Sequence, residues 1–432
     1  MQLYSIKQIV QSGLFKNSAV YTIAGFVNAA IPFLLLPVLT TYLTTADYGI
    51  ITMYATVHAF LYPLFGVNME GAVVRKYYAR DTCFPAYIGS CMVILAATTA
   101  ALSLLLFLFG NSIAEATEIP YEWILTIPVA CVAQFFCALT LSLWQARQKP
   151  LLYSRFQILQ SLANMLLSIL FVVALSCRWR GRVEAILISS ALFALAGAFI
   201  LRRQKDIKIS FTPAYVKHAL RYGGGLIPHA IGGMLILMTN RFFLTEMVSI
   251  DASGLYGVAN QVCMLVSLLT FSFNNAFVPW LFNRLSKNED KRLIVKLTYA
   301  YFAGISAVGL LYYLIQPLVF KLFIGAEFAA AAQYCFWIIL GFVFQGMYFM
   351  VTNYINYAEK TYLQALLTIS IGLVNIPLIY FFIKHFGAVG AAISFSAIFF
   401  LFFVATWVLS AKVYNMPWGL SLRRITYNKG QA

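Results

Sequence analysis

Residues 84–110 read FPAYIGSCMVILAATTAALSLLLFLFG and contain no charged side chain. A helix needs about 20 mostly apolar residues to cross the hydrocarbon core of a bilayer, so this stretch is long enough to span a membrane. Eleven further apolar stretches, nearly all of them long enough to cross a bilayer, occur along the chain, and together they predict twelve transmembrane helices. We expect these spans near residues 18–43, 48–69, 84–110, 123–144, 157–177, 185–201, 223–245, 252–279, 297–318, 329–356, 362–383 and 387–411.

The composition of the whole chain agrees with this pattern, because 62% of its 432 residues are hydrophobic and only 10% are charged. A soluble domain of that composition has too little polar surface to cover its apolar residues. The expected loops are short, and the chain contains no phosphate loop of the nucleotide-hydrolase type, no HExxH motif and no cysteine–histidine metal cluster. We therefore expect an all-α polytopic membrane protein that is not an enzyme and has no cofactor.

The basic residues alternate between the two predicted faces of the membrane. Of the 30 lysines and arginines, 24 fall in the N-terminal segment, the even-numbered loops and the C-terminal tail, whereas the odd-numbered loops hold five of them and most of the acids. The positive-inside rule then predicts that both termini are cytoplasmic. The net charge of +16 is accordingly a topology signal, and we expect no nucleic-acid partner.

The fifth loop is an exception to this alternation. Residues 177–184 read CRWRGRVE, which is a basic sequence although the loop is predicted to lie outside. Either the loop simply departs from the rule, or its arginines contact an anionic ligand on the outer face.

An internal repeat divides the chain into an N-terminal lobe (1–201), a basic cytoplasmic linker (202–221) and a C-terminal lobe (222–432). Three pairs of landmarks recur at separations of 205, 209 and 211 residues, namely Gly49 with Gly254, Arg75 with Arg284 and Lys149 with Lys360. Six spans in each half give both halves the same orientation, so we predict two parallel six-helix bundles related by an axis along the membrane normal. Such bundles usually enclose a binding site at their interface and work by rocking.

Arg241 is the only lysine or arginine well inside an expected span, in the sequence MTNRFF of residues 238–243. An intramembrane charge is a functional candidate by default, so Arg241 is predicted either to contact an anion in a cavity or to extend to the outer interface near Glu246 and Asp251. His229 lies twelve residues earlier in the same span and is a second candidate.

Two ionisable side chains of the second span are also candidates. His58 is predicted either to pack through a hydrogen bond or to face a cavity. Glu70 lies at the inner end of this span, where it can bind substrate or form an ion pair with Arg75 or Lys76. Arg75 and Arg284 lie on the predicted inner face, where their charge suits the capture of an anionic ligand.

Several amides complete the set of candidate binding residues, among them Asn28, Asn240 and Asn260. Amides inside membranes most often join helices through hydrogen bonds. Alternatively, an amide that faces a hydrated cavity can contact the hydroxyl groups of a ligand.

Three segments of the second half carry a resemblance to a known family. They are LRYGGGLIPHAIGG at residues 220–233, TNRFFL at 239–244 and ASGLYGVANQ at 252–261. With LTTADYGI at 43–50 and AFVPWLF at 276–282, the chain resembles the O-antigen and polysaccharide flippases. Their superfamily also contains the multidrug and toxic-compound extruders and the lipid II flippases.

The resemblance implies a twelve-helix, two-lobed transporter of the bacterial inner membrane that resembles the multidrug extruders in fold. It implies that the substrate is an undecaprenyl-diphosphate-linked oligosaccharide, which moves from the inner to the outer leaflet. Membrane lipids and other polysaccharide assembly proteins are the partners implied, with the transporter itself a monomer. Family members often have an acid immediately before the arginine, where this chain has Asn240, so any role of that acid is in doubt here.

Two other functions remain open. An ion-coupled drug extruder of the same fold usually needs buried acids in the N-terminal half to bind a cation, and the first span has none. A membrane-embedded polysaccharide polymerase or acyltransferase needs an extracytoplasmic catalytic group, and only Arg178, Arg180, Arg182 and Glu184 suggest one.

The scarcity of carboxylates inside the spans predicts that transport needs no dedicated proton-coupling acid. With the cell interior negative, moving one negative charge outward is favoured by about 2.3 kcal/mol per 100 mV. Collapsing the membrane potential across proteoliposomes should therefore slow the transport of a lipid-linked glycan. Undiminished transport without a potential would contradict this expectation.

Overall fold

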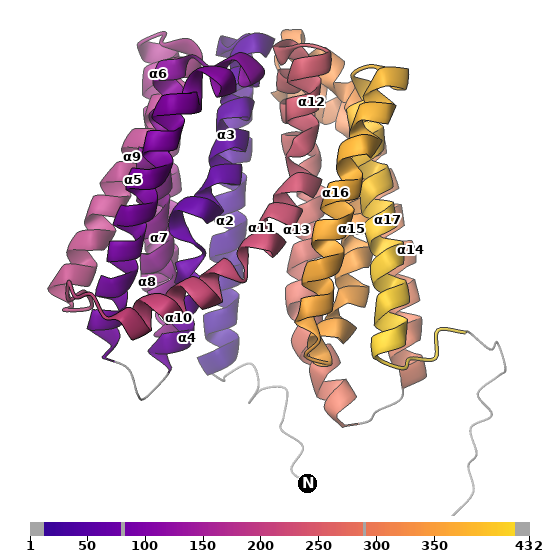
Figure 1. Ribbon diagram of the computed structural model, residues 1–432. Helices are drawn as coiled ribbons and strands as arrows, with labels where there is room; N and C mark the ends of the chain where they lie inside the picture. Colours follow the sequence, from indigo (N-terminus) through magenta and orange to yellow (C-terminus); the bar gives the residue numbers. More distant parts are fainter. Residues whose placement is uncertain (1–12, 79–82, 288–290, 420–432) are drawn as a thin grey trace, which may run out of the picture.

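The computed structural model describes residues 13–78, 83–287 and 291–419, and every regular element in this part of the chain is a helix. Figure 1 shows two upright bundles side by side, one from each half of the chain. The first bundle contains α2 (Gly13–Tyr42), α3 (Thr45–Gly66), the short α4 (Met69–Tyr77), α5 (Phe84–Thr117), α6 (Tyr121–Ile124), α7 (Ile127–Ala146), α8 (Pro150–Ile169), the π-helical turn η1 (Leu170–Ala174) and α9 (Arg178–Arg203).

The second bundle follows an amphipathic connecting helix, α10 (Pro213–Gly224), which lies across one end of the first bundle (Figure 1). The elements of the second bundle are α11 (Ile227–Leu237), α12 (Thr239–Met247), α13 (Ile250–Ser286), α14 (Lys291–Phe323), the 3-10 helix η2 (Ala326–Ala331), α15 (Ala332–Tyr357), α16 (Thr361–Phe386) and α17 (Val389–Val413). The hydroxyl of Tyr215 on α10 accepts a hydrogen bond from the backbone N–H of Cys83, at 3.2 Å. The predicted linker therefore includes a helix that packs on the first bundle.

Ten of the described helices are long and apolar enough to cross a membrane, and the number is eleven when one bent pair counts as a single span. That pair consists of Pro213–Leu237 and Thr239–Met247, which meet at 46°. The first expected span falls on α2, where Ala30–Tyr42 forms a shorter apolar helix. The chain is thus an all-helical, multi-pass membrane protein, as predicted. The number twelve and the cytoplasmic termini stay predictions, since residues 1–12 and 420–432 lie outside the described part.

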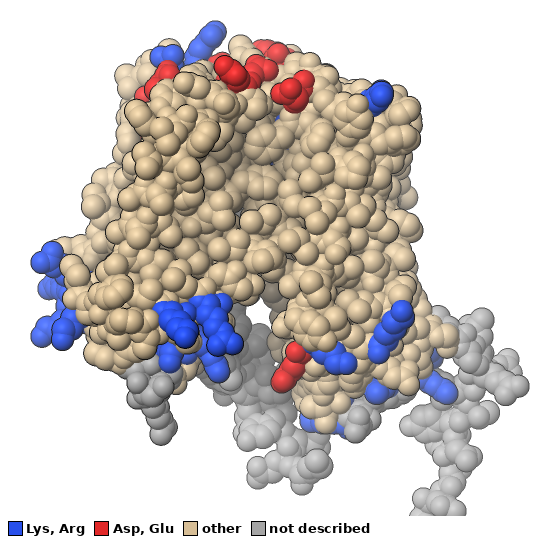
Figure 2. Space-filling model, in the orientation of Figure 1, with Lys and Arg blue, Asp and Glu red and all other residues tan. Residues whose placement is uncertain are grey.

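Charged residues gather at the two ends of the bundles (Figure 2). Acids concentrate at the end where α3 and α13 begin, which bears Asp47, Asp251 and Glu327. Lysines and arginines concentrate at the opposite end, where α4 and α13 finish with Arg75 and Arg284. We call these the acidic end and the basic end; the positive-inside rule predicts that the basic end is cytoplasmic.

The two bundles meet most closely where α3 crosses α13 at the acidic end. A Cβ atom on Gly49 would lie 2.2 Å from the carbonyl oxygen of Ile250, and one on Gly254 would lie 2.0 Å from that of Thr45. Any side chain larger than hydrogen would therefore push the helices apart. The contact is reciprocal, because Thr45 precedes Ile250 by the same 205 residues that separate Gly49 from Gly254, as in the contact of a two-fold pair.

Hydrogen bonds between the bundles surround this crossing. The backbone N–H of Thr45 donates to Oε1 of Glu327 at 3.1 Å, and its hydroxyl donates to the carboxylate of Asp251. The backbone N–H of Gly325 donates to Oγ1 of Thr40 at 3.1 Å. At the basic end the space-filling view instead shows a hollow between the bundles (Figure 2). The structure is therefore closed at the acidic end and open at the basic end.

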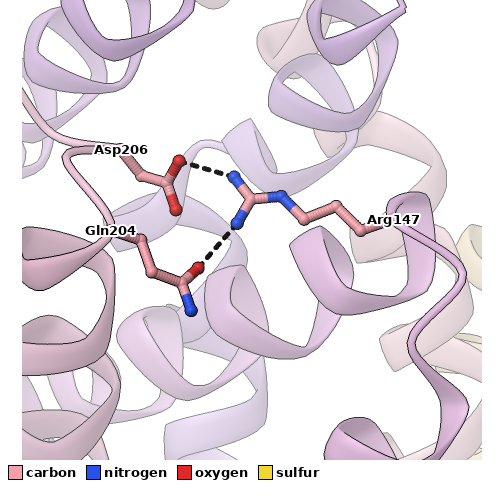
Figure 3. A network of polar contacts seen from close by, with 3 residues as sticks. All are labelled: Arg147, Gln204 and Asp206. Atoms are coloured by element: carbon pink, nitrogen blue, oxygen red, sulfur yellow. Dashed lines mark hydrogen bonds and ion pairs between the residues drawn. The ribbon is translucent and has the colours of Figure 1, made fainter.

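A polar network fixes the loop that leads from α9 to α10 (Figure 3). Nη2 of Arg147 lies 2.5 Å from Oδ1 of Asp206, and Nη1 donates to Oε1 of Gln204 at 2.7 Å. The guanidinium also lies over the ring of Tyr77, 5.7 Å from its centroid. The hydrogen bond to Asp206 raises the pKa of Arg147 above its ordinary value, because the carboxylate stabilises the cation. One side chain thus connects α4, α7 and the loop before α10.

Gly254→Val should separate the bundles at the acidic end, because the new side chain would overlap the backbone of Thr45. The buried Thr52, also at this interface, reports the opening once it is replaced by cysteine in a chain without native cysteines. We expect a water-soluble maleimide to label Thr52→Cys several-fold faster in the Gly254→Val protein in detergent. Gly304→Val is the matched control, since no atom lies within 4 Å of a Cβ there. Unchanged labelling in Gly254→Val would show that the crossing does not hold this end shut.

Asp206→Asn should destabilise the first bundle. It leaves the Arg147 guanidinium, whose side chain is 15% exposed, without its ion-pair partner, at a cost of about 1–3 kcal/mol. We expect the thermal unfolding midpoint in detergent to fall by a few degrees. Gln204→Ala removes only the neutral contact and should have the smaller effect. Equal midpoints for Asp206→Asn and the parent protein would disprove a stabilising role for this pair.

Candidate functional site

A cavity of about 300 Å³ lies between the two bundles, next to the α3–α13 crossing. Helices α2, α3 and α9 form one wall, and α12 and α13 form the other. We call it the central cavity. It is lined by Pro32, Phe33, Leu35, Leu39, Tyr48, Ile51, Thr52, Ala55, Arg182, Ile186, Arg241, Gly257, Asn260, Gln261, Met264, Leu265 and Leu268.

A second cavity, of about 350 Å³, lies inside the first bundle between α2, α7, α8 and α9. It is far more polar than the central cavity, and we call it the amide pocket. It is lined by Asn28, Ile31, Pro32, Leu35, Gln134, Cys137, Ala138, Leu141, Gln157, Gln160, Ser161, Asn164, Met165, Arg182, Ser189 and Ser190. Three residues, Pro32, Leu35 and Arg182, line both cavities.

Arg241 reaches the central cavity from α12, just after the bend that separates α12 from α11. Its Nη1 donates to Oγ1 of Thr56 on α3 at 3.3 Å and contacts Sδ of Met238 at 2.7 Å. Its Nε is buried and has no hydrogen-bond partner. The side chain therefore crosses from the second bundle to the first and keeps part of its hydrogen-bonding capacity unused.

Arg182 reaches the same cavity from the first turns of α9. Its Nη1 donates to Oδ1 of Asn164 at 2.5 Å and to Oγ of Ser168 at 2.6 Å, both on α8. The sequence places this arginine in a basic outer loop, and its position inside a cavity was not predicted. A signal was available, since Arg182 is in helical phase with Ser189 and Ser190, which line the amide pocket with it.

Neither guanidinium group has a carboxylate partner in the part of the chain that the structure describes. Within residues 13–78, 83–287 and 291–419, neither arginine forms an ion pair, and neither cavity is lined by an aspartate or a glutamate. An unpaired charge inside a protein carries a desolvation penalty of several kcal/mol. Two such charges from opposite bundles therefore create a site that favours an anion, and guanidinium groups bind phosphate oxygens in a bidentate manner.

Uncharged polar groups line the central cavity together with the two arginines. The hydroxyl of Tyr48 donates to Oε1 of Gln261 at 2.6 Å, and Nε2 of Gln261 donates to the carbonyl oxygen of Pro32 at 2.8 Å. Tyr48 is close enough to interact electrostatically with both Arg182 and Arg241. This chain of contacts joins α2, α3 and α13 and gives the central cavity a defined polar wall.

The three amide candidates occupy different surroundings. Asn260 lines the central cavity. Asn28 lines the amide pocket and accepts a hydrogen bond from the hydroxyl of Ser161. Asn240 is fully buried and lines neither cavity; its Nδ2 donates to the hydroxyl of Tyr256 at 2.8 Å and to the carbonyl oxygen of Ala391 at 3.2 Å. It therefore joins α12 to α13 and α17.

His58 and Glu70 also lie away from both cavities. The His58 ring is stacked on that of Tyr62, with centroids 6.1 Å apart, and lies near the backbone of Ala130 on α7. The Tyr62 hydroxyl donates a hydrogen bond to the carboxylate of Glu70 on α4. These residues form one polar cluster inside the first bundle.

The remaining candidates do not line the two cavities. His229 is exposed near the start of α11, and Arg75 is exposed in the last turn of α4. The Arg284 guanidinium lies over the ring of Trp280, 5.2 Å from its centroid. Of the residues proposed from the sequence, the structure thus brings Arg241 and Asn260 together in the central cavity. No group of three or more metal-ligating side chains occurs among the described residues.

Comparison with known proteins matches residues 14–285 to the family model described as polysaccharide biosynthesis protein. An uncharacterized membrane protein of Haemophilus influenzae is 25% identical over 354 residues, which cover 81% of this chain and 85% of the relative. A putative O-antigen transporter of Shigella flexneri is 24% identical over 221 residues, covering 50% of this chain and 52% of the relative.

Two solved structures share the fold. The lipid II flippase MurJ in an inward closed conformation has a TM-score of 0.74 at 16% identity, with 91% of this chain and 87% of that chain covered. An inward-facing multidrug resistance MATE family transporter has a TM-score of 0.73 at 15% identity, with 89% and 94% covered. The Shigella relative is described as a transporter, and the two solved structures are a flippase and a transporter; none of the three is described as an enzyme, which agrees with the prediction from the sequence. Because the family model matches more than half of its length, the chain belongs to the polysaccharide biosynthesis protein family.

Proposed function

We propose that this chain is a flippase that moves an undecaprenyl-diphosphate-linked oligosaccharide across the bacterial inner membrane by alternating access. The observation that carries the proposal is the pair Arg182 and Arg241, which come from opposite bundles, line one cavity and have no carboxylate partner among the described residues. The names of the family and of the Shigella relative support the same substrate class.

A diphosphate matches the electrostatics of the central cavity. It carries several negative oxygens on a short group, so it can accept hydrogen bonds from both guanidinium groups together. In doing so it would supply the counter-ion that Arg182 and Arg241 each lack among the described residues. The exposed Arg75 on the basic end, and Arg284 beside Trp280, would attract the diphosphate before it enters.

The shape of the molecule supports alternating access. The hollow between the bundles opens at the basic end, which is the predicted cytoplasmic side, and the α3–α13 crossing closes the acidic end (Figure 2). An anion held by Arg182 and Arg241 would contact both bundles. Its binding would therefore shift the equilibrium between the conformation that is open at the basic end and the one that is open at the acidic end. A ligand shifts such an equilibrium when it binds one conformation better than the other.

The ion-coupled drug extruder is the weaker candidate. Cation binding requires carboxylates in the cavity, and the lining residues of the central cavity and the amide pocket include none. An extruder of this fold would need carboxylates that bind the coupling cation, and the side chains that line the two cavities do not supply them. The monomeric state and contacts with other polysaccharide assembly proteins remain part of the proposal.

Arg241→Ala and Arg182→Ala should each abolish translocation while the protein stays folded and inserted. Loss of a charged hydrogen-bonding partner in a binding site costs about 2–5 kcal/mol, so we expect transport to fall at least about thirtyfold. The measurement is the transfer of an undecaprenyl-diphosphate-linked glycan to the outer leaflet of proteoliposomes, together with surface glycan in cells.

Arg180→Ala is the matched control for Arg182. This neighbouring arginine on α9 lies over the ring of Trp179, 5.6 Å from its centroid, and does not line either cavity. We expect it to transport normally. Normal surface glycan in Arg241→Ala, or an equal loss in Arg180→Ala, would refute the assignment of the central cavity as the diphosphate site.

A further inference from the structure

We propose that the amide pocket binds the sugar residue attached directly to the diphosphate, and that this sugar is uncharged and rich in hydroxyl groups. This inference rests on the proposed function and adds a place and a chemical class for the first part of the glycan. It starts from the position of Arg182, which lines the central cavity and the amide pocket at once.

Because Arg182 lines both cavities, it determines which part of the ligand lies in which cavity. A diphosphate held by Arg182 and Arg241 in the central cavity has its next covalent neighbour within one or two bonds. Because Arg182 also lines the amide pocket, that neighbour can enter the pocket while the phosphates stay on the guanidinium groups. Asn164 and Ser168 fix the guanidinium at this border through bonds of 2.5 and 2.6 Å.

The lining of the pocket indicates an uncharged polar ligand. Asn28, Gln134, Gln157 and Gln160 contribute amides from three different helices. An amide offers both a donor and an acceptor, which suits hydroxyl groups because each hydroxyl also does both. Among the described residues, Arg182 is the only charged one of the lining. A free carboxylate on the sugar would have to share this arginine with the phosphates, and a free amine would find no group of opposite charge there.

Part of this hydrogen-bonding capacity is unused. Oε1 of Gln157 is buried and has no partner, and Nε2 of Gln160 reaches only the Sγ of Cys137, at 3.6 Å. Sulfur is a weak acceptor, and a buried amide without a proper partner costs about 1–3 kcal/mol. A ligand that bonds to these groups removes that cost, which is a source of affinity.

A polar side chain in the middle of α7 indicates that the pocket is accessible to solvent. Gln134 is exposed although it lies well inside the span Tyr121–Ala146, and an amide facing hydrocarbon there would be strongly unfavourable. Because Gln134 lines the pocket, its exposed surface faces this cavity. The volume of about 350 Å³ is near the lower limit of small-molecule sites. The pocket therefore suits the first sugar, and the rest of the glycan would lie outside it.

The test compares two probes on the full chain in detergent, undecaprenyl diphosphate and the same carrier bearing one neutral N-acetylhexosamine. Native mass spectrometry measures both affinities. We expect the parent protein to bind the sugar-bearing carrier at least about tenfold more tightly, which corresponds to about 1.4 kcal/mol. The double variant Gln134→Leu, Gln157→Leu should lose this difference and bind both probes as the parent binds the bare carrier.

Gln345→Leu is the matched control. Gln345 follows Gln134 by 211 residues, lies on α15 of the second bundle, accepts a hydrogen bond from the hydroxyl of Ser267 at 2.7 Å and lines neither cavity. It should keep the preference for the sugar-bearing carrier.

The outcomes separate this inference from the proposed function. A preference that survives in the double variant, or a parent protein that binds both probes equally well, overturns the sugar site and leaves the diphosphate site standing. A parent protein that binds neither probe overturns the proposed function, and the sugar site with it. Loss of the preference in Gln345→Leu as well would show a general effect of removing intramembrane amides and would also overturn the sugar site.

Discussion

The rest of the molecule depends on the close approach of α3 and α13, which is possible only because Gly49 and Gly254 have no side chains. The approach closes the acidic end and brings the second bundle near enough for Arg241 to donate to Thr56. It also places the central cavity directly beside the crossing, since Gly257 of α13 belongs to the cavity lining. A contact that holds one end shut through backbone packing, without covalent or metal links, suits a transporter that must open at that end.

The second constraint is electrostatic. Arg182 and Arg241 retain their charges inside the membrane region without carboxylate partners among the described residues. Folding therefore leaves an unfavourable charge balance that a ligand can correct, whereas a buried ion pair would already be neutral. The amide pocket has a similar deficit of neutral hydrogen bonds, because Oε1 of Gln157 has no partner and Nε2 of Gln160 donates only to a sulfur atom. In the proposed complex the sugar supplies the missing hydrogen bonds. In this account the substrate completes the polar interior of the protein.

The sequence predicts the all-helical, multi-pass class of the protein well, because the bilayer makes long apolar runs necessary and places charge at their ends. It also identifies Arg241, since a single basic residue within an apolar run is unusual. Arg182 was assigned to a loop because the expected span began at 185, whereas α9 begins at Arg178. Asn240 and Asn260 are alike in the sequence, yet one is buried between helices and one faces the cavity. Helix rotation decides this difference, and it depends on packing between residues far apart in the chain.

A structure of the full chain with an undecaprenyl-diphosphate-linked oligosaccharide, determined by electron cryo-microscopy in lipid nanodiscs, tests the central claim most directly. The account predicts density for the diphosphate between the guanidinium groups of Arg182 and Arg241, with the first sugar extending past Arg182 toward α7 and α8. Diphosphate density at any other place, with both arginines left without an anion, would contradict the account.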